Sequence, residues 1–132
     1  FIGSPPMNFI DGHIENGRFV NNSLNLAIPE TLLKTAVSYT GKEVVLGVRP
    51  EHFKTWPGHG HEQVQAEVTS SEYLGNHALL YLQMGDTFGI ANLRLEGMGV
   101  EVKLDELYID MNTAHFFDPE TEKRICSQEN VR

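Results

Sequence analysis

Cysteine, positive charge and long apolar runs are all scarce in this chain of 132 residues. The single Cys126 cannot form an internal disulfide, which is typical of proteins kept in a reducing compartment. No stretch approaches the roughly 18 consecutive apolar residues that a membrane-spanning helix needs. The sequence therefore predicts a cytoplasmic protein that does not itself cross a membrane, with enough residues for one hydrophobic core.

Basic residues are outnumbered, since 10 Lys and Arg stand against 18 Asp and Glu for a formal net charge of −8. The first 66 residues hold 5 basic and 6 acidic side chains, and the other 66 hold 5 and 12, so the halves carry −1 and −7. Binding to a phosphate backbone depends on clustered Lys and Arg. We therefore expect no nucleic-acid partner, and any partner of the second half should be basic.

Motifs for nucleotide binding and hydrolysis are missing as well. The pair Gly41-Lys42 has no glycine-rich loop before it and no Ser or Thr after it, so it is not a P-loop. The nearest nucleophile constellation is Ser70-Ser71-Glu72 with His77, and it lacks the Gly-x-Ser-x-Gly turn of many hydrolases. The sequence predicts no catalytic residue and no nucleotide cofactor bound by the chain itself.

A metal site is the other chemistry to weigh. His59-Gly60-His61 offers two imidazoles on a glycine-rich loop, with His52 seven residues before His59. Zinc sites need three or four ligands around the ion. Because no further Cys or His cluster completes the set, we interpret this loop as solvated and predict no metal.

Short apolar stretches with period-2 alternation and frequent turns dominate what is present. Asn16-Gly17 and Gly85-Asp86 are typical of two-residue hairpin loops. One helix is expected over Glu30–Tyr39, followed by Gly41. Strands are expected at 9–14, 24–28, 43–49, 64–69, 78–84, 87–94, 100–109 and 114–117, with 43–49 buried on both faces and a turn at 96–99. This pattern indicates a mainly β fold, an OB-fold-like small β-barrel with one short helix.

The segment Gly47-Val48-Arg49-Pro50-Glu51-His52 is unusual, because an apolar strand delivers an Arg, a rigid Pro, a Glu and a His at its end. In one interpretation Arg49 and Glu51 pair across the turn and His52 caps a backbone group. In the other, the proline-held loop presents these side chains to a ligand or partner. The sequence leaves both open.

Four motifs in order give the chain a family resemblance: Phe1–Phe9, Leu46–His52, Leu74-Gly75-Asn76 and His115–Thr121. Together they resemble the C-terminal domain, a transport-associated OB domain, of the ATPase subunits of maltose and glycerol-phosphate type ABC importers. Two positions depart from that pattern. His77 stands where many relatives have an acidic residue, and Glu122 stands where relatives usually have Gly.

The resemblance implies three parts: a junction from a missing ATPase domain at 1–8, an OB-like regulatory domain at 9–118, and a C-terminal tail at 119–132. The chain would then be a fragment, with ATP and magnesium bound in the missing domain. Its expected partners are a second copy of the ATPase subunit, the membrane subunits through the missing domain, and a regulatory protein. The expected location is the cytoplasmic face of the cell membrane, within a transporter complex.

Recognition in such a domain should fall on the two constrained turns, which gives six candidate contact residues: Arg49, Glu51, His52, Gly75, Asn76 and His77. A different class of function also fits the composition, namely a stand-alone OB-like domain that binds a small oxyanion or a sugar. A metal-dependent or hydrolytic enzyme is the third class, and the motifs above disfavour it.

Overall fold

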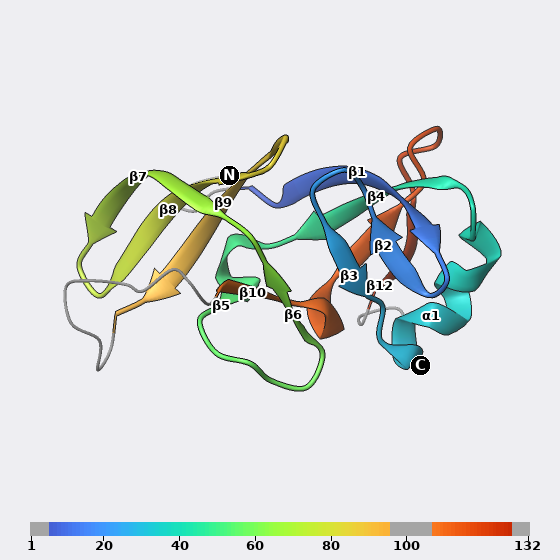
Figure 1. Ribbon diagram of the computed structural model, residues 1–132, viewed down its shortest axis with the longest axis horizontal. Coiled ribbons are helices and arrows are strands. Elements are labelled where there is room, and N and C mark those ends of the chain that lie inside the picture. The colour runs from blue at the N-terminus through green and yellow to red at the C-terminus, as the bar shows by residue number, and fades with distance from the viewer. Residues whose placement is uncertain (1–5, 96–106, 128–132) are drawn as a thin grey trace.

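The computed structural model of the chain describes residues 6–95 and 107–127. Within these ranges the elements are strands, one α-helix and three short 3₁₀ helices (Figure 1). The strands are β1 (Asn8–Glu15), β2 (Arg18–Val20), β3 (Asn25–Ala27), β4 (Glu43–Val48), β5 (Phe53–Lys54), β6 (His61–Val64), β7 (Glu67–Leu74), β8 (His77–Met84), β9 (Thr87–Arg94), β10 (Leu107–Asp110), β11 (His115–Phe117) and β12 (Arg124–Ser127). The helices are α1 (Glu30–Ala36), η1 (Val37–Tyr39), η2 (Pro50–His52) and η3 (Met111–Thr113).

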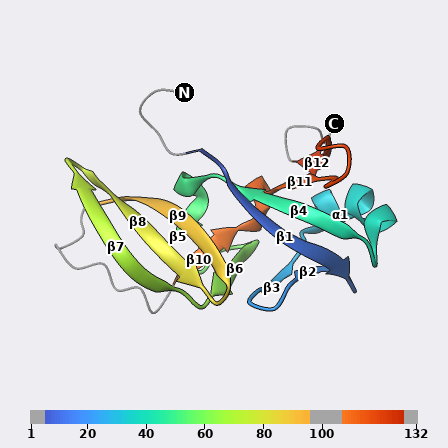
Figure 2. The same ribbon diagram turned by 90° about the horizontal axis from the view of Figure 1, so that it is seen from above.

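The strands form three antiparallel sheets. The largest has the order β12-β11-β4-β1-β2-β3, and two three-stranded sheets have the orders β5-β10-β6 and β7-β8-β9. The two views place β7, β8 and β9 at one end of the molecule and the large sheet with α1 at the other, with the short sheet between them (Figures 1 and 2). The mainly β, OB-type fold is confirmed, but none of these sheets closes on itself in the described part of the chain, so the expected barrel is an open arrangement of sheets.

Local sequence explains the hairpins and the helix. Asn16 and Gly17 both have positive φ, as a type I′ turn between β1 and β2 requires. Gly85 at φ +63° starts the loop between β8 and β9. The expected helix is confirmed at Glu30, with α1 continuing through η1 to Tyr39 and Gly41 following at φ +81°.

One hydrophobic core connects the three sheets and α1. Its largest fully buried side chains are Phe19, Phe53 and Phe116, one from the large sheet's β2, one from β5 and one from β11. Burying such side chains contributes about 1.5–3 kcal/mol each to folding. No helix in the described ranges is long and apolar enough to cross a membrane.

Strand β4 corrects one expectation. Burial on both faces was predicted for 43–49, but Val44, Leu46 and Val48 face the core while Val45 on the other face is half-buried and Glu43 is exposed. Gly47, on the same face as Val45, is buried under Met7 and Phe117, whose side chains an added Cβ would meet. The composition of β4 therefore reflects local cover rather than a second core.

Two more segments differ from expectation. The alternating run 64–69 is split, because β6 ends at Val64 in one sheet and β7 begins at Glu67 in another. Residues 124–127 fall in the predicted tail, yet they form β12 and pair with β11. Pairing with β11 and the packing of Ile125 against the core hold this edge strand in place. The expected turn at 96–99 and most of the strand at 100–109 lie outside the described residues.

Candidate functional site

The first candidate turn is built at the end of β4. Pro50 begins η2, where its fixed φ suits the first helical position and its missing N–H is not needed. The backbone N–H of His52 donates to the carbonyl oxygen of Arg49 at 2.9 Å. Phe53 follows, 1% exposed, and anchors the turn to the core. The buried residues on either side leave the Glu51 side chain exposed and that of His52 half-buried.

The second candidate turn joins β7 to β8. Leu74 pairs with His77, which leaves Gly75 and Asn76 as a two-residue loop. Gly75 has φ +69°, a backbone conformation that residues other than Gly and Asn rarely adopt. The carbonyl oxygen of Asn76 accepts a hydrogen bond from the N–H of Leu95 at 2.7 Å. Backbone geometry therefore explains the glycine at position 75. The exposed side chain of Asn76 is explained only by its place in the loop.

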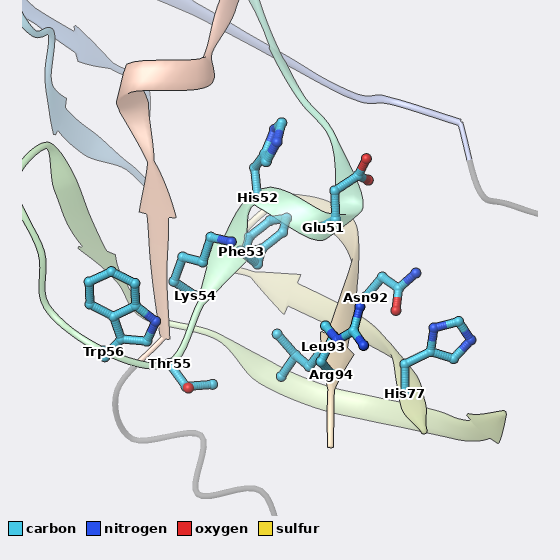
Figure 3. Close-up of a pocket in the computed structure, with 10 residues that line it drawn as sticks. All are labelled: Glu51, His52, Phe53, Lys54, Thr55, Trp56, His77, Asn92, Leu93 and Arg94. Carbon is cyan, nitrogen blue, oxygen red and sulfur yellow. The ribbon is translucent and has the colours of Figure 1, made fainter. Parts of the chain in front are cut away.

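These turns meet at one pocket of about 460 Å³ (Figure 3). Glu51 and His52 come from η2, and His77 comes from the start of β8, directly opposite Arg94 of β9. The lining is Glu51, His52, Phe53, Lys54, Thr55, Trp56, His77, Asn92, Leu93 and Arg94. Three of the six candidate residues thus share a pocket, whereas Arg49, Gly75 and Asn76 are not part of its lining.

The contact that would tie the first turn together is absent. No ion pair joins Arg49 to Glu51, although both side chains are described. His52 caps no backbone group either: its Nδ1 is buried and has no hydrogen-bond partner in the described part of the chain. Burial lowers the pKa of His52, and the Lys54 charge adds to this while Glu51 opposes it. The purely structural interpretation of this segment therefore lacks the interactions that it required.

Sequence reasoning missed Lys54, Thr55, Trp56, Asn92 and Arg94. The signal for Arg94 was present, because a two-residue loop at Gly85-Asp86 fixes the hairpin register and so places Arg94 opposite His77. Lys54 and Trp56 have no such signal. They reach the pocket because β5 pairs with β10, more than 50 residues later in the chain.

The two imidazoles of the histidine loop have different surroundings. The His61 side chain is only 6% exposed: its Nδ1 lies 3.0 Å from the Trp56 carbonyl oxygen, and its ring centroid lies 4.4 Å from that of Trp56. Its Nε2 lies 3.8 Å from a carboxylate oxygen of Asp110. His59 is exposed. Among the described residues no three His, Cys, Asp or Glu side chains gather as metal ligands would.

The Gly41-Lys42 pair also has a structural role. The N–H of Gly41 donates to the Ile14 carbonyl at 2.7 Å, and the N–H of Lys42 donates to the Tyr39 carbonyl at 2.8 Å. A phosphate cradle needs such N–H groups directed at the ligand. These two are used within the fold, so this segment does not fit a nucleotide phosphate.

Comparison with known proteins finds two adjoining family models along the chain. The MalK OB fold domain matches residues 3–53 and the TOBE domain matches residues 46–96. The oligosaccharides import ATP-binding protein MsmX of Bacillus subtilis is 36% identical over 133 residues, which covers 95% of this chain and 36% of MsmX. The multiple sugar-binding transport ATP-binding protein MsmK of Streptococcus mutans is 36% identical over 135 residues, covering 95% and 35%.

An uncharacterized ABC transporter ATP-binding protein, YcjV of Escherichia coli O6:H1, is also 36% identical, over 134 residues. The chain spans only about a third of the length of these curated relatives. The matched models meet within β4 and η2, where the first candidate turn lies. The chain belongs to the family of MalK-type OB-fold and TOBE domains.

Proposed function

We propose that the chain is the C-terminal regulatory and dimerisation domain of the ATP-binding subunit of an ABC importer for sugars or glycerol-3-phosphate-like solutes. The observation that carries the proposal is the similarity to MsmX and MsmK over 95% of this chain. By name, MsmX is an ATP-binding protein of oligosaccharide import and MsmK is one of multiple sugar-binding transport. The parent protein would couple ATP hydrolysis to solute uptake at the cytoplasmic face of the membrane.

The division of chemistry follows from what the residues offer. ATP and magnesium would bind in a separate domain of the parent, because the Gly41-Lys42 segment uses its N–H groups within the fold. This domain would catalyse nothing. It would hold two ATP-binding subunits together, and a two-fold pair with the same surface on both copies is the simplest arrangement.

The six candidate residues are proposed as contacts with the second copy or with a regulator. Glu51 and Asn76 are exposed, and the side chains of Arg49, Glu51, Asn76 and His77 make no hydrogen bond or ion pair within the described residues. Polar groups on constrained loops without a local structural task are the usual carriers of binding. A stand-alone ligand-binding domain is the less supported function, since the relatives are about three times longer than this chain.

Calorimetry with ATP and magnesium tests the division of labour. This chain alone should show no saturable micromolar binding, whereas the parent protein, which should contain a Gly-x-x-x-x-Gly-Lys-Ser/Thr segment upstream, should bind ATP. Saturable binding to the chain itself, or a parent without that segment, would refute the proposal.

A further inference from the structure

Two exposed phenylalanine side chains lie on the same side of the molecule. Phe9 of β1 is 61% exposed and Phe88 of β9 is 55% exposed, and together they line a hollow of about 430 Å³. Phe9 also lines a second hollow, of about 550 Å³, with Phe117 of β11, and the centroids of these two rings lie 5.7 Å apart. The β8–β9 hairpin, β1 and the loop after β11 run along the upper side of Figure 1. A continuous apolar surface of this kind is typical of a protein interaction site.

The charged side chains that line the two hollows are all acidic. Asp11 lines both, Asp86 lines the first, and Asp118 and Glu122 line the second, whereas no Lys or Arg of the described residues lines either. Asp118 accepts hydrogen bonds within its own loop and lies near the charge of Lys42, so it is already engaged. The side chains of Asp11, Asp86 and Glu122 make no hydrogen bond or ion pair within residues 6–95 and 107–127. This charge favours a partner that carries Lys or Arg beside apolar side chains.

We name this region the β1 surface, after the strand at its centre; it consists of Phe9, Asp11, Asp86, Phe88, Phe117 and Glu122. A second copy of the chain does not suit it, because a two-fold pair through one surface brings the same carboxylates together and like charges repel. The two hollows also share no lining residue with the pocket between the two candidate turns. The β1 surface is therefore separate from the contacts proposed above.

The chain enters the domain on this same face. Gly47 of β4 has no side chain, and the Met7 sulfur and the Phe117 ring occupy the space that its Cβ would need. Asn8 then begins β1. Residues 1–5 can span at most about 18 Å, so in the parent that we propose the preceding domain is tethered beside the β1 surface. A partner on so short a tether binds at a high effective concentration.

We propose that the β1 surface docks the preceding ATPase domain of the parent, through a patch of that domain that carries Lys or Arg among apolar side chains. The proposal rests on the proposed function, which supplies this domain. The Phe9 ring lies between the two hollows and is the anchor of the contact, and Asp11 beside it pairs with a basic side chain. Interfaces between domains of one chain commonly combine apolar and charged groups in this way. The contact ties the position of this domain to that of the ATPase domain.

Hydroxyl-radical footprinting with mass spectrometry tests the contact, because it measures how fast each exposed side chain is oxidised. Phe9 and Phe88 should be oxidised at least about fivefold more slowly in the parent than in this chain alone. Val37, 54% exposed on η1, is the control and should change less than about twofold. Equal oxidation of Phe9 in both proteins overturns the proposal. Protection of Phe9 that disappears when the parent is diluted tenfold overturns it as well, because the cover would then be another molecule.

Two charge-reversal variants of the parent test the basic partner. Asp11→Lys should return Phe9 oxidation to the rate found in this chain alone, while Glu67→Lys, at an exposed residue of β7, should leave Phe9 protected. Both variants should keep the far-UV circular dichroism of the parent. Unchanged protection in Asp11→Lys contradicts a basic partner. An exposed Phe9 in a parent that binds ATP overturns the docking surface alone, whereas a parent without an ATP-binding segment overturns the proposed function.

Discussion

The side chain of Asn8 pairs with the backbone of Ile90 in both directions. Its Nδ2 donates to the Ile90 carbonyl oxygen at 2.9 Å, and its Oδ1 accepts from the Ile90 N–H at 2.8 Å. The same Nδ2 also donates to the carbonyl oxygen of Val48 at 3.0 Å. One amide, 9% exposed, thus links the large sheet to the β7-β8-β9 sheet, as an extra ladder rung would.

Asn8→Ala should lower the free energy of unfolding by about 2–4 kcal/mol, because it leaves one N–H and two carbonyl groups in this region without their partner. Urea unfolding measures the loss. Asn22→Ala, at an exposed residue, serves as the control and should stay within about 0.5 kcal/mol of the parent chain. A similar small effect for Asn8→Ala would mean that the sheets are joined by packing alone.

The family resemblance assigned Asn8 to a junction that precedes the OB-like domain. Its partners lie 40 and 82 residues further along the chain, and no local pattern reports contacts at that separation. The hairpins are the opposite case. Asn16-Gly17 and Gly85-Asp86 fix turns between neighbouring strands, so their positions could be predicted from two residues each.

Glu122 takes φ +60°, and its N–H donates to the Asp118 carbonyl oxygen at 2.7 Å. A left-handed conformation costs a residue with a side chain about 1–2 kcal/mol, and glycine at this position avoids that cost. Glycine also has more freedom in the unfolded chain, which lowers the stability of the glycine variant by about 0.5–1 kcal/mol. Glu122→Gly should therefore stabilise the chain by roughly 0.5–1 kcal/mol in urea unfolding. The resemblance to a family that usually has Gly here fits this conformation.

Glu120→Gly is the matched control for that variant, since it removes the same charge two residues earlier, where φ is negative. It should destabilise the chain by about 0.5–1 kcal/mol, because only the entropic effect of glycine remains. If both variants shift stability in the same direction, charge rather than backbone conformation explains the change at Glu122.

Gly75→Ala should destabilise the chain by about 1 kcal/mol through backbone conformation alone, because no atom lies within 4 Å of the added Cβ. Asparagine tolerates positive φ better, so Gly75→Asn should lose less. Thermal unfolding of the two variants makes the comparison. Equal losses of stability in the two variants would show that something other than φ determines which residue position 75 tolerates.

His52 gives stability a pH dependence. Its pKa is lowered chiefly by burial, so the folded chain favours the neutral imidazole. Its contribution is fully present above the ordinary pKa of about 6.5 and is lost as pH falls through the lower folded pKa. Between these pH values, His52→Gln should flatten the decline of unfolding free energy, while His59→Gln at an exposed site should leave it unchanged. An identical slope in both variants contradicts this account.

In the candidate site, as in the fold, the features set by local sequence could be predicted, whereas those set by contacts between distant residues could not. Glu51 and His52 follow Pro50, and His77 follows the turn at Gly75. Both turns could be predicted from the sequence. Their meeting depends on how β9 packs against η2, two elements whose residues are 35 to 44 positions apart in the chain. Trp56 shows the limit most clearly: its place at the pocket comes from a tertiary contact with His61 and from the pairing of β5 with β10.

Sedimentation of the parent ATP-binding subunit, with and without residues 8–127 of this chain, tests the central claim most directly. The account predicts that the intact subunit forms a dimer without nucleotide, and that the shortened subunit is monomeric without nucleotide but still binds ATP. A shortened subunit that dimerises as tightly as the intact one would contradict a dimerisation domain.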